Sequence, residues 1–363
     1  MIRGYGPLLV MWFDVPQEFD VKRGQALIDL ARSLQPDIIV NNRSGAPGDY
    51  DTPEQEVGKF QINRPWETCM TICQQWAWKP DDAMKSLKQC LQTLVLCAGG
   101  DGNLLFNVGP MPDGRIEPRQ VERLREMGAW IGKYGESVYG TRGGPFKPNR
   151  SIASTRRDRT VYVHVLRWEE GPLTLPALPR KILSSALLTG GEVTVAQTAD
   201  GVTIEVPPAD RQEIDTIVKL ELDGPALDIP PLSKPSTIKA AASNVFQGME
   251  EFGPEMAFDG DPGTRWATDG GTKKAWICID LGKPKPIRGV RIREAYAGRV
   301  RKFELQYRDG AAWKAIFAGD GIGESFVREF PPVTAREVRL EILEATEGPT
   351  ICEIGLMGAE GKS

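Results

Sequence analysis

Residues 8–13, LLVMWF, form an apolar run that ends abruptly at a carboxylate, Asp14. A run of this kind is typical of a buried parallel strand with an acid at its C-terminal end. β/α-barrel enzymes place their chemistry at that end of their strands. Asp14 is therefore the first candidate catalytic residue, although very little chain precedes its strand to supply neighbours.

The histidine and cysteine content of the sequence indicates that any catalysis depends on carboxylates. The sequence has one histidine, His164, and no nucleophile near it resembles the elbow of a Ser/His or Cys/His triad. The six cysteines form no CxxC pair, so buried free thiols are the simplest interpretation of them. Cys278 and Cys352 would be able to pair only in an exported protein. We therefore expect no catalytic metal.

Composition excludes several other classes of protein. The 363 residues have a formal net charge of −4, which offers no basic surface for nucleic acid. No apolar run is long enough to predict a membrane-spanning helix. Residues 1–14 read as a strand and not as a signal peptide, because Arg3 is their only basic residue and no small-residue cleavage site follows.

Strands and helices alternate along residues 1–145, and this order predicts parallel βα units. Four or five such units are visible, whereas a closed barrel needs eight. Residues 48–56, GDYDTPEQE, read as an acidic loop among them. The predicted strands are 8–14, 37–43, 66–72 and 103–110, and the predicted helices are 23–34, 81–97 and 117–135.

From residue 146 the pattern becomes all-β. Residues 146–232 show short alternating strands and predict a small antiparallel β-sandwich. A linker rich in proline and serine follows near 225–235, and residues 236–360 read as a second all-β domain.

Several long motifs now resemble a known family. LLVMWFD, VNNR, GDYDTPEQE, WETCMTI, GGDGNLLFNVGPMPDGRI and YGESVYGTR look like the second half of a glycoside hydrolase family 29 α-L-fucosidase, and residues 146–232 resemble its C-terminal sandwich. Residues 236–360, with AFDGDPGTRWAT, AWICIDLG and RDGAAWKAI, resemble a factor V/VIII type C (discoidin-like) jelly roll of the carbohydrate-binding kind. The expected fold is thus a partial (β/α)8 barrel, a β-sandwich and a discoidin-like β-jelly-roll.

The resemblance implies a retaining exo-α-L-fucosidase that uses two carboxyl groups about 5–5.5 Å apart. Asp14 matches the family's nucleophile. Glu54 is the first choice for the acid/base, Glu56 is its close rival, and Glu67 is a third candidate. The substrate-binding residues implied in this way are Trp12, Arg43, Trp66 and Glu67.

The sequence departs from the family pattern in one respect. The family's first barrel half supplies strands one to three and histidines that hold fucose, and neither has a counterpart here. Three explanations are open: a gene fragment, one half of a split enzyme completed by another polypeptide or by self-association, and a remnant that only binds sugar. The alternative function is therefore a non-catalytic carbohydrate-binding protein. By analogy the protein is periplasmic or secreted.

The discoidin-like domain suggests two further sites. Its loops carry Phe246, Phe252, Tyr296 and Arg299, which we expect to contact sugar, while fucosylated glycans are the expected partners of the protein as a whole. A tight loop with oxygen donors on a glycine turn suits calcium. The resemblance implies a structural Ca²⁺ held by Asp259, Asp261, Thr264 and Glu353.

Overall fold

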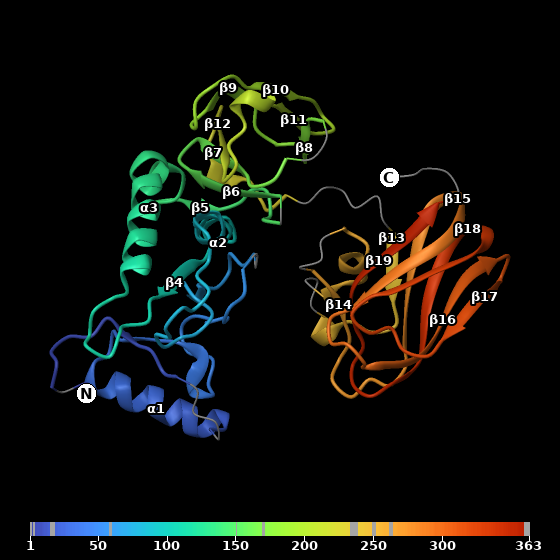
Figure 1. Ribbon diagram of the computed structural model, residues 1–363, viewed down its shortest axis with the longest axis horizontal. Helices are drawn as coiled ribbons and strands as arrows, with labels where there is room; N and C mark the ends of the chain where they lie inside the picture. Colours follow the sequence, from blue (N-terminus) through green and yellow to red (C-terminus); the bar gives the residue numbers. More distant parts are fainter. Residues whose placement is uncertain are drawn as a thin grey trace. The chain divides into compact units, whose positions relative to one another are not determined.

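The computed structural model describes residues 2, 4–14, 19–57, 60–149, 151–168, 171–232, 239–248, 252–260 and 264–358. The chain divides into two compact units, Met1–Lys234 and Pro235–Ser363 (Figure 1). None of the helices in these ranges combines the length and the apolar character needed to cross a bilayer.

The first unit begins with parallel strands. Strand β1 (Val10–Met11) pairs with β2 (Ile39–Val40), and β3 (Glu67–Thr71) pairs with β4 (Asn103–Asn107). Residues 50–54, which we predicted as a loop, connect these two pairs. Single parallel bridges join Tyr50 to Asn41 at the end of β2, and Asp51 and Glu54 to the region of β3. The same ends of all these strands therefore lie along one edge.

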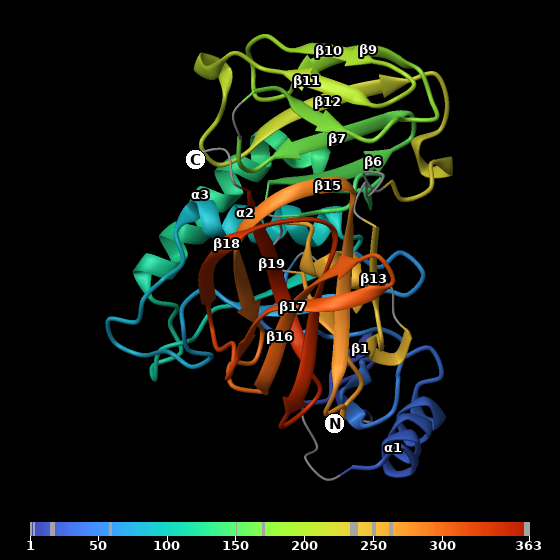
Figure 2. The ribbon, with the colours of Figure 1, turned by 90° about the vertical axis from the view of Figure 1, so that its right-hand side faces the viewer.

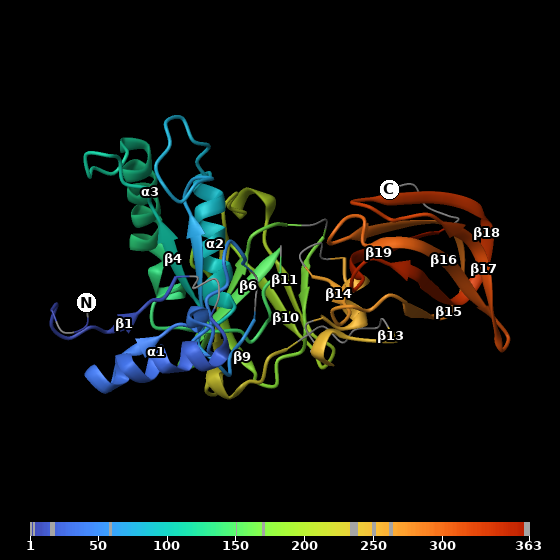
Figure 3. The same ribbon diagram turned by 90° about the horizontal axis from the view of Figure 1, so that it is seen from below.

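Helix α1 (Val21–Leu34) covers the first strand pair (Figure 3). Asp20 caps it, because its carboxylate accepts a hydrogen bond from the backbone N–H of Arg23 at 2.8 Å. The buried side chains of Ile28 and Ala31 pack with Val40 of β2 and the half-buried Met11 of β1. The period of the apolar residues predicted this helix within two residues.

Helix α2 (Leu87–Gly99) starts later than predicted. We expected residues 81–97 with acidic residues in the first turn, and this start is wrong. Asp82 instead accepts hydrogen bonds from the backbone N–H groups of Gln75 and Ala83, which holds it in a loop. Ser86 and Gln89 form a reciprocal capping box that sets the true start. Helix α3 (Pro118–Tyr134) begins at Pro118 as predicted.

The rest of the first unit is antiparallel (Figure 2). One sheet has the order β5-β6-β7-β12-β9 and the other β10-β11-β8, and both contribute to one apolar core that includes Val163, Val202 and Leu220. The strand bounds are β5 Arg142–Gly143, β6 Ile152–Arg157, β7 Thr160–Val165, β8 Leu173–Leu175, β9 Ile182–Leu187, β10 Thr194–Gln197, β11 Val202–Glu205 and β12 Thr216–Leu222.

The second unit is a seven-stranded antiparallel sheet of order β14-β19-β15-β18-β16-β17, with β13 also paired to β15. Trp266 and Phe303 are fully buried in its core. The strand bounds are β13 Lys239–Ala242, β14 Trp266–Ala267, β15 Ala275–Glu294, β16 Val300–Asp309, β17 Ala312–Gly319, β18 Phe326–Ala345 and β19 Thr350–Gly358. All six cysteines of the chain, including Cys278 and Cys352, are free thiols.

Candidate active site

The Arg43 guanidinium joins two carboxylates of the parallel-strand region. Its Nη1 lies 2.7 Å from Glu54 Oε2 and 3.5 Å from Asp14 Oδ1. The sum of these two distances is therefore an upper bound on the separation of the two carboxylate oxygens. That bound is compatible with the spacing of about 5–5.5 Å that a retaining glycosidase needs.

Arg43 itself is held firmly. It follows β2 in a short 3₁₀ turn, Asn42–Ser44, and its side chain is only 13% exposed. Its Nε donates to the Thr52 hydroxyl at 3.0 Å, and its Nη2 donates to the Thr52 carbonyl at 3.1 Å and to Cys69 Sγ at 3.2 Å. Burial raises the pKa of the Cys69 thiol, which keeps this neighbour neutral. The nearly buried cation is thus neutralised by Asp14 and Glu54 alone among the described residues.

Asn41 fixes the backbone next to Asp14. Its amide is fully buried, accepts a hydrogen bond from the Phe13 N–H at 2.9 Å and donates one to the Phe13 carbonyl at 2.8 Å. Beyond the last backbone pair of β1 and β2, the Asn41 side chain thus bonds the Phe13 backbone in place of a strand neighbour. The Asp14 carboxylate is thereby presented beyond the sheet edge, where its side chain is 77% exposed.

Glu54 is positioned by the segment at 50–54. The Asn42 side-chain oxygen accepts hydrogen bonds from the Thr52 N–H at 3.1 Å and from the Thr52 hydroxyl at 2.7 Å. On the other side the Cys69 N–H donates to the Pro53 carbonyl at 3.0 Å. The residue before Glu54 is therefore tied to β3, and Glu54 itself is 43% exposed at the same edge as Asp14.

Trp12 and Glu67 form the next part of the site. The Trp12 indole N–H donates to Glu67 Oε1 at 3.3 Å, and the Arg43 guanidinium lies 4.8 Å from the centre of the Trp12 ring. Burial, together with the nearby Glu67 carboxylate, raises the pKa of Tyr50 to about 12. Tyr50 therefore stays protonated at any ordinary assay pH.

Two of the candidate residues lie elsewhere. Glu56 is exposed, and its backbone carbonyl accepts from the Thr68 hydroxyl at 2.7 Å, but within the described residues its carboxylate forms no ion pair with Arg43. Trp66 is 1% exposed and its indole N–H donates to the Gly100 carbonyl at 3.1 Å. The structure places Trp66 in the core, so it offers no free aromatic face at this edge.

The supporting roles of Asn41 and Thr52 were not predicted. The sequence showed Asn41 and Asn42 as polar residues after a strand, and Thr52 as part of an acidic loop. A buried asparagine whose side chain makes the hydrogen bonds of a strand backbone has no sequence signature that a single sequence would reveal. The available signal was the placement of three consecutive polar residues, Asn41–Arg43, at a strand end.

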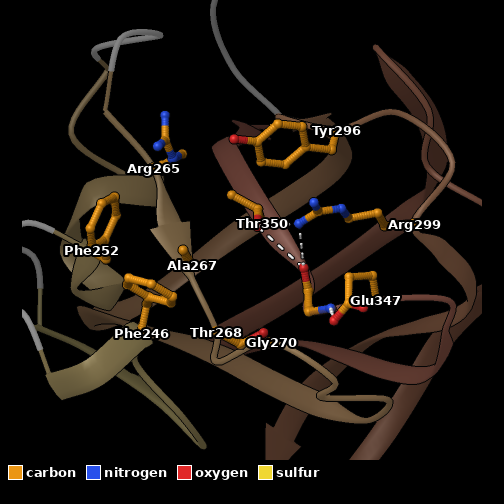
Figure 4. A pocket seen from close by; sticks show the side chains of 11 residues that line it. Phe246, Phe252, Arg265, Ala267, Thr268, Gly270, Tyr296, Arg299, Glu347 and Thr350 are labelled. Carbon is orange, nitrogen blue, oxygen red and sulfur yellow. Dashed lines mark hydrogen bonds between the residues drawn. The ribbon is translucent and has the colours of Figure 1, made fainter. Parts of the chain in front are cut away.

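A second candidate site lies in the second unit. It is a pocket of about 280 Å³ (Figure 4). Aromatic and basic side chains face it from several loops, and they include all four residues predicted to contact glycans. Its main lining side chains are Phe246, Phe252, Arg265, Tyr296, Arg299 and Glu347.

The predicted calcium residues are only partly brought together. Thr264 Oγ1 lies 2.8 and 2.9 Å from the two Asp259 carboxylate oxygens and 3.1 Å from the Met256 carbonyl, which is a cluster of hard oxygen donors. Asp261 lies outside the described residues. Glu353 is on β19, in register with Arg293 of β15. Within the described ranges no group of three or more His, Cys, Asp or Glu side chains is placed to hold a metal ion.

Comparison with known proteins finds a separate family match in each of the two units. Residues 1–136 match the Alpha-L-fucosidase family model, and residues 239–355 match the F5/8 type C domain. An α-L-fucosidase from Branchiostoma floridae is 34% identical over 203 residues, which cover 49% of this chain and 43% of that protein. The chain thus spans less than half the length of the curated relatives it matches.

Solved structures extend the likeness. Alpha-L-fucosidase isoenzyme 1 from Paenibacillus thiaminolyticus aligns with a TM-score of 0.55 at 29% identity, covering 61% of this chain and 59% of that one. An α-L-fucosidase from Vibrio sp. strain EJY3 covers 96% of this chain and 68% of its own at a TM-score of 0.62, and its 19% identity shows the fold alone. Residues 1–136 are therefore similar to the α-L-fucosidase family, and residues 239–355 are similar to an F5/8 type C domain.

Proposed function

We propose that the first unit belongs to a retaining exo-α-L-fucosidase, in which Asp14 is the nucleophile and Glu54 the acid/base. The observation that carries this proposal is the single Arg43 nitrogen within ion-pair distance of both carboxylates. In the first step Asp14 attacks the anomeric carbon while protonated Glu54 gives its proton to the departing glycosidic oxygen. In the second step Glu54 takes a proton from water while the water oxygen attacks the anomeric carbon, and the bond from that carbon to Asp14 breaks to release fucose.

Arg43 has a defined part in this mechanism. Because Glu54 must be protonated to act as an acid, it has to leave Arg43 for the glycosidic oxygen when substrate binds. Arg43 is then left beside Asp14, with its Nη1 3.5 Å from the carboxylate of the proposed nucleophile. Trp12 lies against Arg43 and binds Glu67, which supports a role for Trp12 and Glu67 in contacting the sugar.

Hydrolysis of 4-nitrophenyl α-L-fucoside tests this assignment. We expect Asp14→Ala to lose activity to background, and Glu54→Gln to slow the second step by about 10²–10⁴-fold. Azide should rescue Glu54→Gln as fucosyl azide, since azide needs no general base. Glu56→Gln is the matched variant. If it, and not Glu54→Gln, gives azide rescue, the acid/base assignment is wrong.

The parallel strands support the proposal that this region is part of a (β/α)8 barrel. β1 and β4 each have a hydrogen-bonding edge with no strand partner among the described residues. The side chains of Asp14 and Glu54 are 77% and 43% exposed, whereas a closed active site excludes water from its catalytic groups. We infer that a complementing barrel half, or a second copy of the chain, covers this site during turnover.

The F5/8 unit supports a carbohydrate-binding role, and binding without catalysis is the alternative function. Its pocket with aromatic side chains is the observation in favour. The two functions separate in one experiment. Binding of fucosylated glycans, with no turnover even when a second polypeptide carrying further strands of a (β/α)8 barrel is added, would favour the binding protein. A periplasmic or extracellular location is proposed from the family likeness alone.

We also propose a structural calcium in the F5/8 unit. The oxygen cluster of Asp259, Thr264 and Met256 fits a hard cation in part. Thermal unfolding should show a Tm for the second unit that falls with EDTA and recovers with Ca²⁺ but not with Mg²⁺. Asp259→Ala should lower the Tm and remove its response to Ca²⁺. An unchanged Tm in EDTA would argue against the metal.

A further inference from the structure

The pocket of the F5/8 unit carries two arginines. Arg299 is fixed, because its Nη1 donates to the Gly348 carbonyl at 3.0 Å and its guanidinium lies 4.0 Å from the centre of the Tyr296 ring. Its Nε and Nη2 have no hydrogen-bond partner within the part of the chain that the structure describes. These two nitrogens are the edge of a guanidinium that binds a carboxylate or sulfate in a bidentate way.

Arg265, the residue before β14, also lines the pocket (Figure 4). Its guanidinium lies 5.3 Å from the centre of the Phe252 ring, and Phe252 packs edge-to-face with Phe246 at 5.4 Å between centroids. Like Arg299, it forms no ion pair with a described residue. Each guanidinium therefore lies against an aromatic ring and forms no ion pair with a described carboxylate.

Glu347, the one carboxylate of the described lining, forms no ion pair with either arginine within the described residues, although the nearby charge of Arg299 contributes to lowering its pKa. It accepts hydrogen bonds from the backbone N–H groups of Gly271 and Gly348. Those bonds, with the Gly271 N–H first, lower the pKa of Glu347. The Glu347 carboxylate is thus hydrogen-bonded to backbone N–H groups. The pocket retains two arginine guanidinium groups beside three aromatic rings.

We propose that this pocket binds an acidic sugar, with Arg265 and Arg299 on its carboxylate or sulfate group and the aromatic rings against the apolar face of its ring. The volume of about 280 Å³ is near the lower end for ligand pockets and suits one or two sugar residues. This inference rests on the carbohydrate-binding part of the proposed function. It does not depend on Asp14 or on turnover.

Calorimetric titration of the full chain tests the proposal. The probes are galactose, galacturonic acid and galactose 6-sulfate, which differ only at C6. We expect at least one charged sugar to bind about ten-fold or more tightly than galactose, and its affinity to fall between about 50 and 300 mM NaCl. Which charged sugar binds identifies the anion as carboxylate or sulfate.

Variants locate the effect. Arg265→Gln should remove most of the preference, because the Arg265 side chain makes no hydrogen bond to a described residue whose loss would disturb the fold. Arg288→Gln, an exposed position on β15 outside the pocket, makes the same change in net charge and should leave the preference intact. A charge preference that both variants keep, or both lose, would place the anion elsewhere and overturn the proposal.

Two other outcomes also overturn it. One is equal or tighter binding of galactose. The other is no binding of any of the three sugars, with binding instead to vesicles of about 30% phosphatidylserine, which would assign the arginines to a lipid surface. Loss of fucosidase activity has no bearing on either result, so failure of the two proposals is distinguishable.

Discussion

At the scale of single residues, Arg43 connects stability with the proposed chemistry. Its planar fork reaches Thr52, Cys69 and Glu54 at once. Lysine keeps the charge but cannot fill this geometry. We predict that Arg43→Lys lowers the free energy of unfolding of the first unit by about 1–3 kcal/mol and lowers kcat/KM at least ten-fold. Urea denaturation and the aryl-fucoside assay measure the two effects.

The matched control for Arg43→Lys is Arg115→Lys. Arg115 pairs with Asp113 on the surface, where both side chains are largely in water. An exposed pair contributes little, so this variant should stay within about 0.5 kcal/mol of the native chain. Equal losses in the free energy of unfolding of the two variants would show that the contacts of the Arg43 guanidinium contribute no more than a surface ion pair.

His164 and Asp215 form a pair of a different kind. The single histidine of the chain is fully buried, with Nδ1 2.6 Å from the Asp215 carboxylate, which is 1% exposed. His164→Phe would leave that carboxylate buried without its partner, and we predict a loss of about 3–5 kcal/mol in the free energy of unfolding. His164→Phe with Asp215→Leu should regain much of it. A double variant no more stable than the single one would contradict this account.

At the scale of elements, Gly102 shows how a loop and a core tryptophan depend on each other. A Cβ at Gly102 would lie 2.2 Å from the Trp66 ring. Because the buried ring has nowhere to move, Gly102→Ala should cost about 1–3 kcal/mol in the free energy of unfolding. Gly128, inside α3, meets nothing within 4 Å, so Gly128→Ala should stabilise the chain by about 0.5–1 kcal/mol. Denaturant unfolding of both variants tests the contrast, and two changes of the same sign would contradict it.

Elements with a strong period were predictable from sequence, and those fixed by side chains were not. The apolar spacing of α1 predicted its span, and Pro118 predicted the start of α3. The start of α2 is set by the Ser86–Gln89 capping box, and Asp82, which we expected in the first turn, is held in a loop by the backbone N–H of Gln75. Residues 50–54 lack alternation, yet they join β2 to β3, because Asn42 and Cys69 hold them from either side.

The same limit applied to the candidate site. The strand-end position of Asp14 and the nearby Glu54 and Arg43 were identified from motifs, and the structure brings these three together. The interior place of Trp66 was not foreseen, since a tryptophan before a strand suits a rim or a core equally well. The hydrogen bond from its indole N–H to the Gly100 carbonyl and the close approach of Gly102 to its ring mark Trp66 as a core residue.

At the scale of the whole molecule, one face of the first strand pair is left uncovered. Met11 and Val40 pack toward α1, so their neighbours in the strands, Val10 and Ile39, face the other way. Val10 and Ile39 are in register with each other and each is 38% exposed. Leu9 beside them is 75% exposed. Adjacent apolar side chains at a strand edge favour association with another chain.

We therefore predict that the purified chain self-associates through this face. Sedimentation velocity over about 1 to 50 µM should show concentration-dependent oligomers. Replacing both Val10 and Ile39 by Lys should shift the distribution toward monomer, because two charges on that face would have to be desolvated in the contact. Leu183→Lys, at a 61% exposed position on β9, is the control and should leave the oligomers unchanged. A native chain that stays monomeric throughout this range would contradict the prediction.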